Sequence, residues 1–207
     1  MALLTSVLVR GINNLSDARY CAGMGADSLT FRLDPALTEA LTPEAVQELS
    51  GWVAGVQLIG EFDTLPVADI SAVVQQCGLH AVLLHRRRPA HELAQLPVPA
   101  LRLLPWVPDM LPEDVDLRFR ELAPHHHGFV LAAPPTPLPT PADLVRLTEQ
   151  ARTYPLWLSA GYAPTTLRDF VELVQPAGIV LEGGDEIKPG LRDFDEMEAV
   201  FEQLEEQ

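Results

Sequence analysis

Several marks of common protein classes are absent from this sequence. It has only two cysteines, Cys21 and Cys77, which lie far apart in apolar, helix-like surroundings, so a reduced protein without disulfides is expected. No apolar run is long enough to cross a bilayer, and the apolar start carries no basic segment. Neither G-x-G-x-x-G, G-x-x-x-x-G-K-[ST] nor a zinc-ligand spacing occurs, so no cofactor and no metal are expected. The cytoplasm is the expected location.

Positive charge is also scarce. Fourteen Lys and Arg residues stand against 29 Asp and Glu, which gives a net charge of −15. Such a surface repels nucleic acid and anionic membranes, and neither is expected as a partner. The length of 207 residues and the 47% hydrophobic content suit a single domain over residues 1–207, as a monomer or a homodimer.

What the sequence does contain is one pattern repeated eight times, a short apolar run followed by an amphipathic segment. The apolar runs are 6–12, 27–33, 53–62, 81–85, 100–106, 128–133, 156–161 and 179–183. This alternation predicts an α/β protein with one parallel sheet closed on itself, the (β/α)8 TIM barrel. A doubly wound open sheet is the alternative.

The segments between these runs show helical spacing. Residues 43–52 place Val46, Leu49 and Trp52 on one face, residues 166–174 have a similar face, and residues 193–207 form an acidic amphipathic tail. Thr42 and Thr140 each precede a proline, which predicts helix starts at these points.

The two ends and the middle of the chain resemble one family. Residues 179–193 read IVLEGGDEIKPGLRD, which is similar to the V-D-V-S-S-G-V-E-x-x-P-G-x-K-D of phosphoribosylanthranilate isomerase, an enzyme of tryptophan biosynthesis. Residues 9–13, VRGIN, fall where that family has I-C-G-I-T, and residues 25–27, GAD, match its G-A-D. Leu84 and His85 match its Q-L-H-G, and residues 158–161, LSAG, its L-A-G-G.

The resemblance implies a barrel with aldose–ketose isomerase chemistry, an intramolecular oxidoreductase, yet the family's proton carriers are missing. Its base is the cysteine of I-C-G-I, where this chain has Arg10, and its acid is an aspartate ending the sixth strand, where this chain has Ala132. Arginine does not release a proton near neutral pH and alanine has none to give. The expected protein is therefore impaired or inactive on that substrate, a pseudoenzyme. The alternative is a binding or regulatory barrel, or an enzyme with a changed substrate.

The ligand-binding residues implied by the resemblance are also altered. A phosphate in such barrels is held by the loops after strands seven and eight, where Gly161, Gly183 and Gly184 keep the required small residues. Glu182 replaces a neutral serine there and disfavours phosphate. A small anionic or sugar-like molecule is the expected partner, with Arg10, His85 and Glu182 as further binding candidates.

Strands one and eight are neighbours in a closed barrel, so Arg10 is expected to pair with Glu182 and fill the former active site. Replacing both by Leu is then expected to be nearly neutral. In the alternative interpretation Arg10 binds a carboxylate or phosphate of some other ligand.

Two basic clusters each allow a functional interpretation, as a binding site, and a structural one. His85 and residues 86–88 follow the fourth apolar run and form either an anion clamp or, as the preferred interpretation, a solvated basic turn. The triplet 125–127 is histidine throughout, but adjacent side chains cannot converge on one metal ion, and it enters the sixth strand from the face opposite the chemistry.

Overall fold

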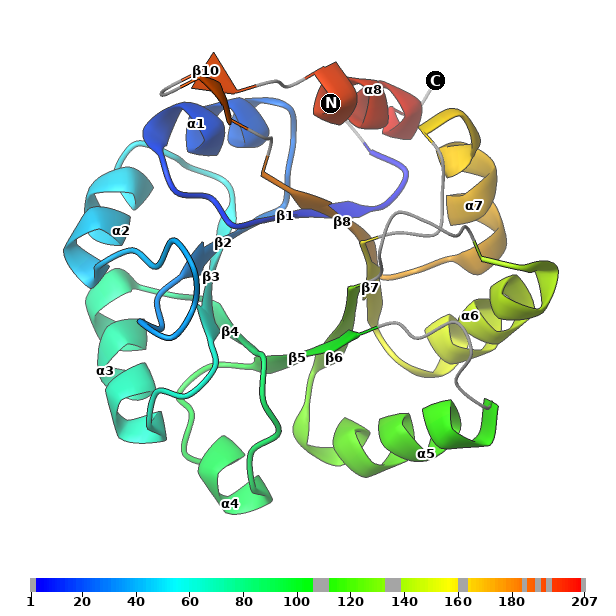
Figure 1. Cartoon of the computed structure of the whole chain (residues 1–207), viewed down its shortest axis with the longest axis horizontal. Coiled ribbons are helices and arrows are strands. Elements are labelled where there is room, and N and C mark those ends of the chain that lie inside the picture. Colours follow the sequence, from blue (N-terminus) through cyan, green and yellow to red (C-terminus); the bar gives the residue numbers. More distant parts are fainter. Residues whose placement is uncertain are drawn as a thin grey trace.

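The computed structural model describes residues 3–105, 112–132, 139–159, 164–183, 186–188, 191–192 and 195–205. Its centre is a closed barrel of eight parallel strands, each paired with the next in chain order (Figure 1). The strands are β1 (Ser6–Arg10), β2 (Ser28–Arg32), β3 (Gln57–Phe62), β4 (Ala81–Leu84), β5 (Ala100–Pro105), β6 (Gly128–Ala132), β7 (Leu156–Leu158) and β8 (Gly178–Glu182). Strand β8 closes the barrel on β1 through five consecutive residue pairs, which confirms the predicted TIM barrel and makes the open sheet wrong.

Helices surround the barrel as an outer ring (Figure 1). They are α1 (Leu15–Gly23), α2 (Pro43–Ser50), α3 (Val67–Cys77), α4 (Ala90–Leu93), α5 (Pro112–Leu122), α6 (Pro141–Thr153), α7 (Leu167–Val174) and α8 (Asp195–Leu204). Two 3-10 turns, Ala123–His125 and Pro164–Thr166, and a two-stranded sheet of β9 (Glu186–Lys188) and β10 (Leu191–Arg192) complete the described elements. None of the helices in the described residues is long and apolar enough to cross a membrane.

The two predicted helix starts are confirmed. The Thr42 side chain accepts a hydrogen bond from the backbone N–H of Ala45, and Thr140 forms a reciprocal capping box with Asp143. The apolar face predicted for residues 43–52 is correct except for its last residue, Trp52. Helix α2 ends at Ser50, and Trp52 lies beyond the last turn with 64% of its surface exposed.

Side chains of the strands alternate between the barrel interior and the helical ring. Leu8, Ile59, Leu83, Val130 and Val180 belong to one buried cluster that fills the interior. The alternate positions belong to the larger cluster shared with the helices, and the largest of these are Phe31, Phe62 and Phe129. This alternation places the final inward positions of β1, β3 and β8 at the carboxyl-terminal mouth.

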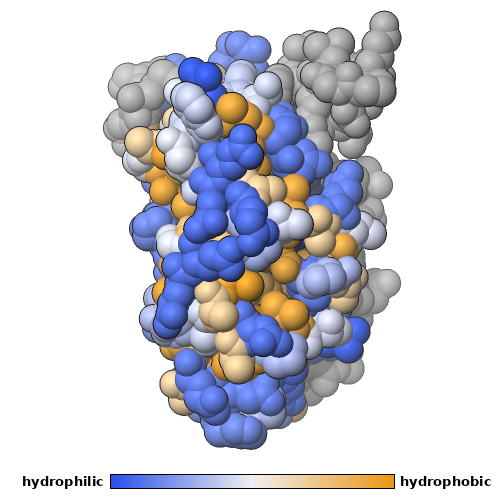
Figure 2. Space-filling model, turned by 90° about the vertical axis from the view of Figure 1, so that its left-hand side faces the viewer, coloured by the Kyte–Doolittle hydropathy of each residue, from blue (hydrophilic) through white to orange (hydrophobic). Residues whose placement is uncertain are grey.

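The flank of the barrel that carries α2 and α3 is largely hydrophilic (Figure 2). Figure 2 shows the flank formed by the left side of Figure 1, where α2 and α3 lie, with hydrophobic residues scattered among hydrophilic ones. Among the described residues, the exposed large apolar side chains come from different segments; they are Trp52, Leu117, Val145 and Leu173. Both cysteines, Cys21 and Cys77, are free and buried, as expected.

Candidate functional site

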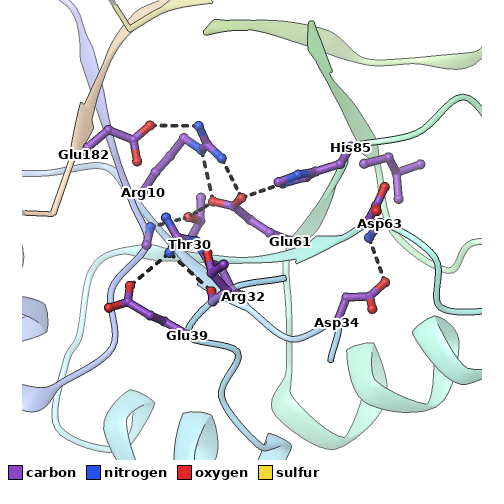
Figure 3. A network of polar contacts seen from close by, with 12 residues as sticks. Arg10, Thr30, Arg32, Asp34, Glu39, Glu61, Asp63, His85 and Glu182 are labelled. Atoms are coloured by element: carbon purple, nitrogen blue, oxygen red, sulfur yellow. Dashed lines mark hydrogen bonds and ion pairs between the residues drawn. The ribbon is translucent and has the colours of Figure 1, made fainter. Parts of the chain in front are cut away.

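Arg10 ends a strand whose three preceding residues, 7–9, are apolar and buried, and it takes the last inward position of β1. Its guanidinium is buried inside the barrel mouth (Figure 3). Arg10 Nη1 donates to Glu182 Oε1 at 2.8 Å, because the register of β1 and β8 places the two residues side by side. The predicted contact between Arg10 and Glu182 is therefore confirmed.

A second carboxylate, Glu61 of β3, which the sequence patterns did not predict at this site, contacts Arg10 through two hydrogen bonds. Arg10 Nε and Nη2 donate to Glu61 Oε1 and Oε2 at 3.1 and 2.7 Å, a bidentate pair, and the Glu61 side chain has no exposed surface. The sequence did contain a signal for this buried ion pair, which is the carboxylate near the end of the strand QLIGEF. The expectation that replacing only Arg10 and Glu182 would be neutral is thus not supported, because the charge of Glu61 would remain buried.

Two further donors complete the surroundings of Glu61. Thr30 Oγ1 donates to Glu61 Oε1 at 2.5 Å and itself accepts the backbone N–H of Gly11 at 3.0 Å. His85 Nε2 lies 2.7 Å from Glu61 Oε2. Gly11 has φ +71°, and a Cβ there would lie 3.1 Å from Arg32 Nη2, so glycine suits this close approach.

The residues of the basic turn after β4 lie in three different surroundings. His85 points at Glu61 and belongs to the mouth, which the interpretation as a solvated turn did not predict. Arg86 and Arg87 are largely exposed and pair with Asp63 and Glu121. Arg88 is mostly buried and donates to the carbonyls of Asp63 and Leu65, a structural role.

The charges of the mouth affect one another. Burial opposes ionisation of Glu61, but the hydrogen bonds from His85 and Arg10 outweigh it and lower the pKa of Glu61 to about 2. Glu182 differs: its partial burial raises its pKa, Arg10 opposes this, and the charge of Glu61 adds to it. Burial lowers the pKa of Arg10, yet its carboxylate partners reverse this and raise it. With His85 neutral, Arg10 and the two carboxylates carry a net charge of −1.

Other predicted site residues are placed as follows. Ala132 ends β6, which is not adjacent to β1, and its side chain is half-buried. The backbone N–H of Gly183 donates to the carbonyl of Arg10 at 2.9 Å. Gly161 and Gly184 lie outside the described residues.

The histidine triplet lies away from the mouth. His126 is buried, and its Nδ1 contacts the carbonyl of Leu122 at 2.9 Å, just before β6 begins. Within the described residues, no group of three His, Cys, Asp or Glu side chains could hold a metal ion.

The fold and the site define a (β/α)8 barrel with a buried ion-pair network at its carboxyl-terminal mouth, the face where proteins of this fold have their active sites.

Comparison with curated proteins finds phosphoribosylanthranilate isomerases. That of Synechococcus sp. (strain JA-2-3B'a(2-13)) is 27% identical over 96% of this chain and 89% of its own length. That of Geobacter sulfurreducens is 28% identical over 92% of this chain and 93% of its own length.

Solved structures give the same result for the fold. Phosphoribosylanthranilate isomerase from Thermotoga maritima superposes with a TM-score of 0.78 at 23% identity, covering 97% of this chain and 98% of its own. A complex of such an isomerase with reduced 1-(o-carboxyphenylamino)-1-deoxyribulose 5-phosphate also gives 0.78, at 21% identity. A scan against models of protein families matches none. The resemblance to phosphoribosylanthranilate isomerases, expected from short motifs, therefore extends along nearly the whole chain.

Proposed function

We propose that this chain is a divergent phosphoribosylanthranilate isomerase-like protein that performs the family's isomerisation slowly or not at all. One observation carries the proposal: the residue at the position of the family's base, Arg10, is fixed by Glu61 and Glu182. Three of its N–H groups hold carboxylates, and its pKa is raised, so it does not exchange protons near neutral pH. Ala132 offers no replacement acid.

The magnitude of the loss follows from the two missing groups. A general acid or base contributes a factor of about 10² to 10⁴ each. The isomerisation needs both, because it moves a proton from one carbon of the sugar while the ring opens. Turnover of phosphoribosylanthranilate is therefore expected to be very low.

The ligand that fits the mouth is sugar-like rather than phosphorylated. Glu182 is 52% exposed and stands beside the loop where a phosphate would bind, and a carboxylate within about 5 Å of a phosphate costs roughly 1 kcal/mol or more. The amide of Gly183 is already bonded to Arg10. We include Arg10, His85, Gly161, Glu182, Gly183 and Gly184 in the proposed binding site.

A second candidate function is a binding or regulatory barrel without catalysis. The same contacts of Arg10 with two carboxylates favour it, since the ion pairs fill the place of the family's base. In both candidates the chain is one domain over residues 1–207, and its free cysteines suit the cytoplasm.

Growth complementation tests the proposal. A tryptophan auxotroph that lacks the isomerase is transformed with this chain, with an intact isomerase as the positive control, and folded protein is verified by circular dichroism of the purified product. We expect no growth without tryptophan. Growth restored by this chain would overturn the proposal.

A further inference from the structure

The hydrogen bond to Glu61 places a proton on Nε2 of His85. Glu61 is ionised, because its pKa is lowered to about 2, and an ionised carboxylate only accepts hydrogen bonds. The 2.7 Å contact between His85 Nε2 and Glu61 Oε2 therefore requires the proton to sit on Nε2. In the neutral imidazole, Nδ1 then carries the free lone pair.

The position of the ring leaves that nitrogen available. His85 directly follows β4, and its backbone N–H donates to the carbonyl of Phe62 at 2.8 Å, which anchors the residue at the rim of the barrel. The side chain is 19% exposed, and no hydrogen bond among the described residues engages Nδ1. Figure 3 shows the ring reaching toward Glu61 from the side opposite Glu182, with Arg10 between.

We propose that His85 is an acid–base group of the barrel mouth, aligned by Glu61, and that it acts on a hydroxyl of a sugar-like ligand. In this step the ligand O–H bond breaks, its electron pair stays on oxygen, and the proton forms an N–H bond at Nδ1. The proton returns to the ligand from the same nitrogen, so no other reactant is consumed. This inference takes its sugar-like ligand from the proposed function and rests on it to that extent, but it assigns chemistry to a residue other than the two lost proton carriers.

Charged side chains face His85 from several elements. Glu61 contacts it from β3, Arg10 and Glu182 lie beyond Glu61 on β1 and β8, and Asp63 is neutralised by Arg86 on the adjoining loops. When His85 takes up a proton, two cations face the carboxylates of Glu61 and Glu182, and the network becomes neutral. Arg10 is a positioning residue, since it keeps Glu61 ionised and in place.

The tautomer is measured by ¹⁵N NMR of histidine-labelled full-length protein at about pH 8.5, roughly two units above the usual imidazole pKa. His85→Gln assigns the signals, because a glutamine amide can still donate to Glu61 while offering no basic nitrogen. We expect Nε2–H as the single tautomer in the wild type. Glu61→Gln is expected to give a mixture, since an amide can both donate and accept. Nδ1–H in the wild type, or no change in Glu61→Gln, would overturn the proposal.

Access to the lone pair is measured by acylation with diethyl pyrocarbonate followed by peptide mapping. The exposed His91 on α4 is the internal control. We expect His85 to be acylated in the wild type under conditions that modify His91. An unmodified His85 would mean that its ring has only a structural role. Both measurements are independent of turnover of phosphoribosylanthranilate, so their outcome is separable from that of the proposed function.

Discussion

At the scale of single residues, the mouth depends on an arginine that reaches past its neighbouring strand. Arg10 of β1 contacts Glu61 of β3, and the short Thr30 of β2 lies between them and bonds to the same carboxylate. Adjacency of strands was enough to predict the contact with Glu182. It could not predict Glu61, because that contact depends on side-chain length and on the small residue at the intervening position.

The buried charge of Glu61 decides what substitutions at Arg10 do. Arg10→Leu is expected to cost about 3 to 5 kcal/mol, since it strands a fully buried carboxylate, whereas Glu182→Leu costs less than about 1 kcal/mol because the side chain is half-exposed. Adding Glu61→Gln to Arg10→Leu should recover part of the loss. Denaturant unfolding of the single and double variants measures this. A double variant as unstable as the sum of its parts would show that the two residues do not interact.

Acid sensitivity follows from the same carboxylate. The folded-state pKa of Glu61, about 2, lies below its unfolded value near 4.3, so its contribution is complete above about pH 4.5 and is lost as the pH falls toward 2. Glu182 has a raised pKa and acts in the opposite direction. The free energy of unfolding is therefore expected to fall on acidification, and less steeply in Glu61→Gln. Denaturant titrations at a series of pH values check this; equal slopes in both proteins would contradict it.

At the scale of elements, apolar runs and caps predicted the strands and helix starts, because both depend on local sequence. The ends were less predictable. Strand β7 ends at Leu158, before Ser159 of the expected run, and helix α2 ends at Ser50, before Trp52. The ends of strands depend on where hydrogen bonding to the neighbouring strands stops, and the ends of helices depend on contacts from other elements. Neither can be predicted from the local sequence pattern.

One buried aspartate joins the loops that follow two of these strands. Asp34, after β2, is 1% exposed and accepts the backbone N–H groups of Ala36, Asp63, Thr64 and Leu65. Burial opposes its ionisation, but these four donors lower its pKa.

Asp34→Ala removes the acceptor for all of these amides and is expected to destabilise the protein by about 3 kcal/mol. Asp69→Ala, in the exposed first turn of α3, is the matched control and should change stability by less than about 1 kcal/mol. Thermal unfolding of the two variants measures the difference. Equal effects would mean that Asp34 does not hold the two loops.

At the scale of the whole molecule, eight alternations of apolar run and amphipathic segment were sufficient to predict a closed barrel. Closure itself is shown by the register of β1 with β8, and relatives with the same fold match nearly the whole chain. The chemistry was less predictable than the fold, because it depends on which inward side chains meet at the mouth. Arg10, Glu61 and His85 come from three strands or strand ends that are far apart in sequence.

The most direct test of the account is the rate at which the purified protein converts phosphoribosylanthranilate. Ordinary enzymes reach kcat/KM of about 10⁴ to 10⁸ M⁻¹s⁻¹, and loss of both proton carriers is expected to lower such a value by a factor of about 10⁴ or more. An intact isomerase, assayed at the same protein concentration, is the control. We predict turnover at or near the uncatalysed background. Turnover in the ordinary enzymatic range would contradict the account, because Arg10 and Ala132 would then have working substitutes.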